Sequence, residues 1–306
     1  MAGRVPCGIS IPQTFDKRPI DLELIRRFAP RAEELGYDSL WVQEQLIGDA
    51  CVLEPVTLLT YVAALTSKAR LGTAVLLTAI RNPVHLAKSL ASLDQLSGGR
   101  VTLGVGIGGP QTPHEIFGIP RERRPQRFVE GLRVIRALWS EPKASVAGEF
   151  WRFENVAMEP KPVQRPLPIW FGAREPLGLK RAARHGDGWM GPGSSSSAEF
   201  VKHVGLLRGY FAESKRDLAK FPLSKRVYLA IDDDRARAER RLKEWFGVRY
   251  RNAEMAPRVA IYGSLEQVTG KLRELVDAGA QHLLLDPVFD HEHHAELLAR
   301  AVVPKL

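Results

Sequence analysis

The chain has 306 residues, of which 44% are hydrophobic and 26% are charged. These fractions lie close to the ~45–50% and ~25% of an average globular protein, and they exclude a mainly disordered, fibrous or coiled-coil chain. The 44 Lys and Arg residues outnumber the 35 Asp and Glu residues, which gives a net charge of +9. This excess favours an anionic partner without identifying it.

The cysteine content and the hydropathy of the chain predict its compartment. The two cysteines, Cys7 and Cys51, are too few for a disulfide framework, so we expect both to be reduced. Residues 1–13 lack the apolar core and the cleavage site of a signal peptide. The longest run without Asp, Glu, Lys or Arg, residues 101–114, is shorter than the about 20 apolar residues of a membrane span. We therefore expect a cytoplasmic protein with no membrane segment.

Short apolar runs alternate along the chain with longer segments that carry apolar residues at helical spacing. The first kind is typical of buried strands and the second of amphipathic helices. In chain order, the predicted strands and the helices that follow them are 5–11 and 21–35, 39–42 and 55–67, 71–77 and 83–96, 101–105 and 125–138, 168–171 and 176–185, 188–190 and 198–214, 227–230 and 234–251, and 282–285 and 292–302. A further helix is predicted at 265–278, before the last strand.

Eight strand–helix units predict an α/β fold with a parallel sheet. This number fits a (β/α)8 TIM barrel, as a single domain over 1–306, better than an open doubly wound sheet. The alternative, a Rossmann-like fold, needs a G-x-G-x-x-G turn after the first strand, and Ile11-Pro12-Gln13-Thr14 offers none. Residues 143–166 interrupt the alternation after the fourth unit. There, 144–146 and 150–153 predict a β-hairpin insertion that turns at Gly148-Glu149.

In such a barrel the active site lies at the carboxyl ends of the strands, and two glycine-rich segments fall there. Residues 105–109 permit a ligand to approach the backbone closely, although a glycine-rich turn by itself more often indicates a flexible loop. Residues 191–197 place hydroxyls and free N–H groups before a helix, which is typical of a phosphate site. The alternative for this second segment is an ordinary helix cap in a loop.

Other kinds of site find little support in the sequence. There is no zinc-type spacing of Cys and His, no nucleophile elbow and no Walker loop. We read His291, His293 and His294 as a solvated helix start rather than a metal site. The arginine clusters at 121–127 and 235–251 lack the interleaved aromatic residues of a nucleic-acid surface. The residues thus predict an enzyme for an anionic, phosphate-bearing ligand, with no metal and no nucleic-acid partner.

Several segments, spread over nearly the whole chain, match the motifs of one known family in the same order. They are Leu71–Val75, Arg81-Asn82-Pro83, Leu93–Gly106, Glu130 with Leu138-Trp139, Gly148–Trp151, Pro168–Gly172 and Ala183–Trp189. As a set, these segments resemble the luciferase-like monooxygenase superfamily, and the overall pattern is most similar to its F420-dependent oxidoreductases.

The resemblance implies a barrel with an insertion that binds the deazaflavin coenzyme F420, or alternatively FMN, at its carboxyl-terminal face. It implies hydride transfer between the deazaflavin C5 and a small organic substrate. In the F420-dependent branch the third strand commonly ends in a non-prolyl cis peptide, and the matching bond here is Ala74–Val75. Because F420 is more anionic than FMN, the positive net charge agrees with this branch.

The resemblance also assigns roles to particular residues. It implies cofactor contacts from Gln43, Thr73, Ala74, Val75, Gly106, Ile107, Gly108, Gly172, Ala173, Gly193, Ser194 and Ser195. At the second strand end, Glu44-Gln45 replaces the Asp-His or similar pair of many relatives. Gln45 cannot act as a general acid at neutral pH, whereas Glu44 can if burial raises its pKa. The alternative for Glu44 is a hydrogen bond to the cofactor ring.

The sequence does not identify the substrate. Trp41 and His114 are candidate pocket residues, with a core role as the alternative for Trp41. Gly109 stands where some sugar-phosphate dehydrogenases have a Glu, and Arg174-Glu175 stands where relatives often have Gly-Gly. These departures argue against a glucose-6-phosphate dehydrogenase type of substrate. An FMN-dependent monooxygenase and a non-catalytic flavin-binding protein are the alternative functions. A homodimer is compatible with the sequence, which does not decide the oligomeric state.

Overall fold

The computed structural model describes residues 4–15, 19–109, 112–214 and 216–306. Parallel strands form a closed barrel in the order β10-β11-β12-β14-β1-β3-β5-β7, and pairing of β7 with β10 completes the ring. The barrel strands are β1 (Cys7–Ser10), β3 (Ser39–Val42), β5 (Arg70–Thr73), β7 (Val101–Gly106), β10 (Ile169–Gly172), β11 (Gly188–Gly191), β12 (Leu223–Ile231) and β14 (His282–Pro287). The predicted TIM barrel is confirmed.

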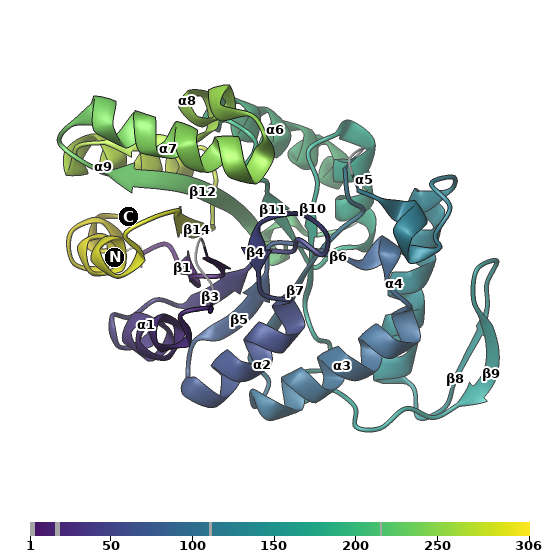
Figure 1. Ribbon diagram of the computed structural model, residues 1–306. Coiled ribbons are helices and arrows are strands. Elements are labelled where there is room, and N and C mark those ends of the chain that lie inside the picture. The colour runs from purple at the N-terminus through teal and green to yellow at the C-terminus, as the bar shows by residue number, and fades with distance from the viewer. Residues whose placement is uncertain (1–3, 16–18, 110–111, 215) are drawn as a thin grey trace.

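Helices surround the barrel, as Figure 1 shows. They include α1 (Leu22–Glu34), α2 (Pro55–Leu65), α3 (Pro83–Leu96), α4 (Arg124–Ser140), α5 (Pro176–His185), α6 (Ser197–Ala212), α7 (Arg235–Tyr250), α9 (Leu265–Asp277) and α10 (His291–Leu297). Local chemistry sets their ends. The Asp21 carboxylate accepts the N–H of Leu24 and caps α1, and Gly36, at φ +85°, follows its last turn. The last predicted helix instead continues beyond α10 as a π-helix over Leu298–Val302.

The third strand is interrupted, which corrects the continuous strand predicted at 71–77. β5 ends at Thr73, and pairing with β7 resumes in β6 (Leu76–Leu77). Between them the Ala74–Val75 peptide bond is cis, as the resemblance implied. The Thr73 hydroxyl spans this point by donating to the Gly104 carbonyl at 2.7 Å and accepting the Gly104 N–H at 3.0 Å. The chain therefore bulges from the sheet for two residues.

β12 is longer than the strand predicted at 227–230. Its first half includes Lys225 and Arg226, whose charges concealed the strand in the sequence. Its far end pairs with β13 (Ile261–Gly263), which the sequence did not predict. A small antiparallel sheet of β2 (Thr14–Phe15) and β4 (Cys51–Val52) was also missed, because two-residue strands carry no periodicity.

The predicted insertion forms the hairpin of β8 (Ala144–Ala147) and β9 (Arg152–Val156), which projects beside α4 in Figure 1. Glu130 of α4 fixes its turn. The Glu130 carboxylate accepts the N–H groups of Glu149, Phe150 and Trp151 at 3.1, 2.9 and 2.9 Å. The hairpin is thus attached to the barrel layer, while the description of 1–306 as one domain stays a prediction.

The barrel interior contains aromatic and polar side chains as well as aliphatic ones. His282 lies between the hydroxyls of Ser39 and Ser224, at 3.0 and 2.7 Å. Burial lowers the pKa of His282 to about 4, so its ring is neutral at pH 7. Trp41 packs on this ring and on Trp170, with centroids 5.5 and 5.7 Å apart. This layer closes the barrel below its mouth.

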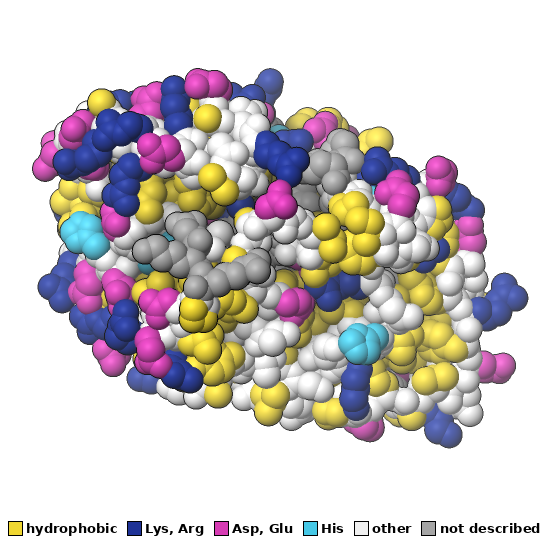
Figure 2. Space-filling view, in the orientation of Figure 1, with side chains coloured by type: hydrophobic (Ala, Val, Ile, Leu, Met, Phe, Trp, Pro, Cys, Tyr) yellow, Lys and Arg dark blue, Asp and Glu magenta, His cyan; other side chains and the backbone are white. Residues whose placement is uncertain are grey.

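The surface in Figure 2 carries no single charged patch. Lys and Arg side chains are mixed with Asp and Glu side chains over α7 and around α1, and hydrophobic side chains are exposed between them. Cys7 and Cys51 are both free. Within the described ranges, no helix is long and apolar enough to cross a membrane.

Candidate active site

The bulge at Ala74–Val75 fits into a cradle made by glycines of the neighbouring strands. A Cβ built on Gly106 or on Gly172 would lie 2.7 Å from a methyl group of Val75, and one on Gly104 would lie 3.4 Å away. A Cβ atom does not approach another heavy atom within 3.0 Å, so β7 needs glycine at position 106 and β10 needs glycine at position 172. Gly106 and Gly172 thus make room for Val75, which is partly exposed at the mouth.

The loop after β11 presents unpaired donors in front of a long helix. The Ser195 N–H donates to the Pro192 carbonyl, and the Ser196 N–H donates to Glu199 in a capping box. Within the described parts of the chain, the N–H groups of Gly193 and Ser194 meet no acceptor. The Ser195 hydroxyl is buried and likewise has no partner there. Unpaired buried donors before a helix N-terminus form a site for an anion.

Lys225 of β12 fixes the conformation of this loop. The sequence analysis did not identify Lys225 as a site residue. Its side chain is buried, and its Nζ donates to the carbonyls of Pro192 and Ser195 at 2.5 and 2.7 Å. Burial lowers the pKa of Lys225 to about 7, against the opposing charge of Glu199. The loop conformation thus depends on a side chain from the next strand.

A buried ion pair crosses the mouth of the barrel. Arg226 Nε and Nη2 donate to Asp286 Oδ2 at 2.8 and 2.5 Å. Arg226 Nη1 also donates to the Ala74 carbonyl at 3.1 Å, and Gln43 Nε2 lies 3.3 Å from the same Asp286 oxygen. Gln43 is therefore linked to the bulge through Asp286 and Arg226. Asp286 directly follows the strand predicted at 282–285, and nothing in the sequence indicated Arg226.

Both oxygens of Glu44 are occupied by structural partners. One accepts the Leu77 N–H, and the other accepts Arg81, which also pairs with Glu54 at 3.0 Å. Burial raises the pKa of Glu44, and the charge of Arg81 opposes this shift. These contacts fix the segment after β6 and leave Glu44 no free oxygen for a reacting group. Gln45 folds back against Gly48 of its own loop.

The two candidate pocket residues lie outside the mouth cavity described below. Trp41 is 1% exposed and donates from Nε1 to Ser39, so the geometry favours the core role. His114 is buried in the 3-10 turn η2 (His114–Phe117), with its Nε2 at 3.4 Å from Arg124. Burial, followed by the charge of Arg124, lowers the pKa of His114. The preceding residues 110–111 lie outside the described ranges.

The remaining predicted cofactor contacts are distributed around the bulge. Gly108 has φ +88°, and a Cβ there would clash with Thr112, so its role is conformational. Ile107 is partly buried against the core. The Ala173 carbonyl accepts the indole N–H of Trp189 at 2.8 Å. Ala74 is 7% exposed and packs inside the barrel near Met190.

A cavity of about 390 Å³ opens at the mouth, beside the ends of β1, β3 and β14. This volume lies in the ~300–1,000 Å³ range of small-molecule sites. Described residues that line it are Ile11, Gln13, Thr14, Phe15, Pro19, Asp21, Leu24, Gln43, Trp245, Val288, Phe289, Asp286, Asp290 and His291. The Gln13 amide donates to the carbonyls of Gln43 and Leu53, both at 2.6 Å, and holds the walls together.

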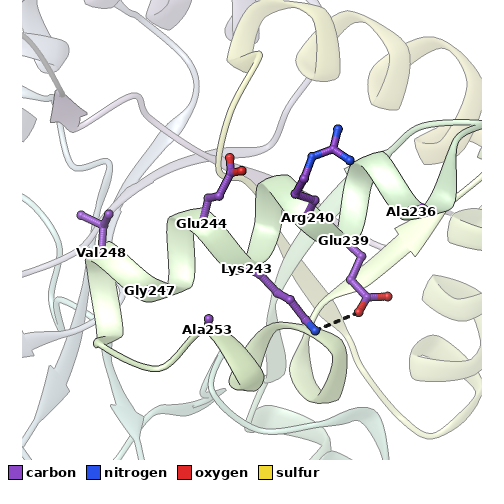
Figure 3. Close-up of a pocket in the computed structure, with 8 residues that line it drawn as sticks. All are labelled: Ala236, Glu239, Arg240, Lys243, Glu244, Gly247, Val248 and Ala253. Carbon is purple, nitrogen blue, oxygen red and sulfur yellow. Dashed lines mark ion pairs between the residues drawn. The ribbon is translucent and has the colours of Figure 1, made fainter.

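Figure 3 shows a second hollow, of about 730 Å³, on the exposed side of α7. Its lining residues belong to α7 and to the 3-10 turn η4 (Ala253–Met255), and none comes from a strand end. Lys243 and Glu239 form an ion pair across it at 3.3 Å. Active sites of TIM barrels lie at the strand ends, so the mouth cavity is the better candidate.

Comparisons with known proteins agree with this architecture. The family model described as luciferase-like monooxygenase matches residues 5–299. An F420-dependent glucose-6-phosphate dehydrogenase from Kineococcus radiotolerans is 32% identical over 229 residues, which cover 71% of this chain and 67% of that protein. An F420-dependent secondary alcohol dehydrogenase, solved with an F420-acetone adduct, is similar in fold, with a TM-score of 0.86, 20% identity and 99% of each chain covered.

A protein of Mycobacterium tuberculosis described as uncharacterized is 39% identical over 166 residues, or 54% of this chain. That match spans 58% of the length of the relative, which is less than two thirds. The family match, in contrast, extends over nearly the whole chain and includes every barrel strand. The chain belongs to the luciferase-like monooxygenase family.

Proposed function

We propose that this protein is an F420-dependent oxidoreductase that transfers a hydride between the deazaflavin and a small organic substrate. The observation that carries the proposal is the Val75 bulge, seated on Gly106 and Gly172 and followed around the mouth by the anion loop of Gly193 and Ser194. The relative from Kineococcus radiotolerans is named as an F420-dependent enzyme, and it supports this choice of cofactor.

Different residues of this chain bind different parts of the cofactor. Gly193, Ser194 and Ser195 offer two N–H groups and a hydroxyl to the phosphate group, and Lys225 keeps them in place. Val75 and the backbone of 106–108 and 172–173 support one face of the ring. When bound, the cofactor supplies a carbon that accepts or gives up the hydride. The protein supplies orientation and exclusion of water.

Which residue exchanges a proton with the substrate is a separate question from cofactor binding. Glu44 was the sequence candidate, and its contacts with Leu77 and Arg81 favour a structural role instead. Asp286 and His291 line the mouth cavity and are better placed to exchange a proton with a substrate. Burial lowers the pKa of His291, with the charge of Asp286 opposing, so the ring is neutral at pH 7 and able to accept a proton.

A titration with F420 and with FMN tests the cofactor. We expect saturable quenching of F420 fluorescence, a weaker response to FMN, and reduction or oxidation of F420 in the presence of a substrate. Binding of FMN with no response to F420 would favour the alternative, an FMN-dependent monooxygenase, which the name of the family keeps in view. Tight binding of either cofactor without any turnover would favour a non-catalytic flavin-binding protein.

The cytoplasmic location and the homodimer stay predictions. The first rests on the two free cysteines. Sedimentation of the purified protein tests the second.

A further inference from the structure

We propose that the mouth cavity binds an uncharged organic substrate in preference to phosphorylated or carboxylated ones. This proposal rests on the proposed function, because it assigns the substrate class of the same site. It is argued from the charges and the surfaces that the described residues present to the cavity.

Half of the described residues that line the cavity are apolar. Ile11, Phe15, Val288 and Phe289 contribute aliphatic and aromatic surface, and Trp245 of α7 adds an indole ring. Trp245 is held by Tyr228, whose ring centroid is 5.3 Å away. Tyr228 in turn hydrogen-bonds to Tyr250 at the end of α7. Apolar surface combined with polar groups in fixed positions is typical of sites for small organic molecules.

The charged groups that line the cavity are acidic, and each has a partner. Asp286 is neutralised by Arg226, and Asp290 forms an ion pair with Arg241. Asp21 caps the N-terminus of α1. His291 is the one basic side chain among the described lining residues, and its lowered pKa leaves it uncharged at pH 7. Among the described lining residues, an anionic substrate would therefore lose its hydration without gaining an unpaired counter-charge.

The cavity lies beside the proposed cofactor site rather than within it. The cavity adjoins the ends of β1, β3 and β14, whereas the cofactor loops follow β5, β7, β10 and β11. Arg226 connects the two regions by contacting both Asp286 and the Ala74 carbonyl. A substrate in the cavity would thus sit next to the bulge that supports the ring. Gln43, at the same edge, provides an amide that can bind a carbonyl or hydroxyl oxygen.

Two ligands with the same ring and different charges test the proposal. Calorimetry with F420-loaded protein compares cyclohexanone with 4-oxocyclohexane-1-carboxylate, and turnover with reduced F420 compares the same pair. We expect the neutral ketone to be favoured by at least about tenfold in both measurements. Equal or tighter binding of the carboxylate overturns the proposal, as does binding of neither ligand.

The cavity could also discriminate between the two ligands by their shape. Variants that change only the charge of the cavity separate the effect of charge from the effect of shape. Thr14 is half-buried on the cavity wall, so Thr14→Lys adds a cation there and is expected to shift the ratio about tenfold toward the carboxylate. Val248→Lys adds the same charge on the outer side of α7, where Val248 is 72% exposed, and is expected to leave the ratio unchanged. Equal effects of both variants would contradict the proposal.

Failure of this proposal is distinguishable from failure of the proposed function. If F420 does not bind, the proposed function fails, while the charge preference of the cavity can still be measured on cofactor-free protein. If F420 binds and glucose 6-phosphate or the carboxylate is turned over as well as the ketone, the substrate class is wrong and the cofactor assignment stands.

Discussion

Gly172 is required as glycine because the side chain of Val75 packs directly against it. Its Cα hydrogen faces the methyl groups of Val75, and a Cβ would come within 2.7 Å of one of them. Val75 cannot withdraw easily, because it belongs to a bulge fixed on both sides by β5 and β6. The same reasoning applies to Gly106, so both glycines, which the sequence predicts as cofactor contacts, make room for Val75.

We expect Gly172→Ala to destabilise the protein by roughly 1–3 kcal/mol, because overpacking forces the bulge to move. It should also weaken F420 binding, since we propose that Val75 supports the ring. Urea denaturation and the fluorescence titration measure the two effects. Gly205→Ala is the matched control. Gly205 lies exposed in α6 with no atom near its Cβ position, so this change should stabilise by about 0.5–1 kcal/mol. If the Gly172→Ala variant were as stable as the wild type, the proposed close packing of Gly172 against Val75 would be wrong.

Lys225 gives the stability of the protein a defined dependence on pH. The buried amine has a pKa of about 7, whereas a lysine in the unfolded chain titrates near about 10.4. Between these values the unfolded state binds more protons, so stability rises with pH, by at most about 1.4 kcal/mol per unit. Below pH 7 both states are charged, and the burial of the charge opposes folding fully.

The test compares wild type with Lys225→Met at pH 7 and pH 9. We expect the wild type to gain free energy of unfolding relative to the variant as pH rises, because the variant lacks the titrating amine. Exposed Lys68→Met should follow the wild type at both values. A pH-independent difference between wild type and Lys225→Met would show that the buried amine does not titrate in this window.

At the scale of elements, the hairpin of β8 and β9 depends on one carboxylate of α4. Three N–H groups converge on Glu130, and Arg127 of the same helix lies over the rings of Phe150 and Trp151 at 4.7 and 5.2 Å. The hairpin turn is therefore held as a unit by a single helix face.

Glu130→Gln keeps the size of the side chain and removes its charge. Hydrogen bonds to a charged acceptor contribute about 1.5–3 kcal/mol, and a neutral amide recovers only part of this. We expect faster hydrogen exchange in 144–156 with little change in the barrel strands. Glu154→Gln, on the exposed strand β9, is the control and should leave exchange unchanged. Equal protection in the Glu130→Gln variant would place the anchor elsewhere.

The sequence predicts the regular elements well where their signals are local. Asn82-Pro83 fixes the start of α3, and the apolar periodicity places α3 and α5 with their observed ends. It fails where long-range contacts override local preference. Lys225 and Arg226 occupy the interior of a strand because each has buried partners, carbonyls of the loop after β11 for Lys225 and Asp286 of β14 for Arg226, and no local pattern records those partners. For the same reason the network of Gln43, Arg226 and Asp286 could not be predicted.

At the scale of the whole molecule, the chain carries a net charge of +9. Figure 2 shows basic and acidic side chains intermixed on the visible face. A polyanionic cofactor is then attracted by the electrostatic field of all the charges of the protein together. Salt at physiological concentration screens this field over about 8–10 Å. The local donors of Gly193–Ser195 are less affected, because they act at contact distance.

We therefore expect F420 affinity to fall between about 50 mM and about 500 mM salt, and to fall more steeply than FMN affinity, since F420 carries more negative charge. Titrations of both cofactors at the two salt concentrations measure the slopes. Parallel slopes would mean that the extra charges of F420 lie beyond the field of the protein.

The adjacent positions of Lys225 and Arg226 have a consequence for folding. Neighbouring residues on a strand face opposite sides of the sheet, so Lys225 points to the helix layer and Arg226 into the barrel. A slip of β12 by one residue against β14 would exchange them. The ammonium would then face Asp286 inside the barrel, and the bulkier guanidinium would be forced behind the anion loop. Each face of β12 therefore carries a different cation with its own partners. A barrel with β12 in the wrong register would be destabilised by unfavourable electrostatic interactions as well as by poor packing.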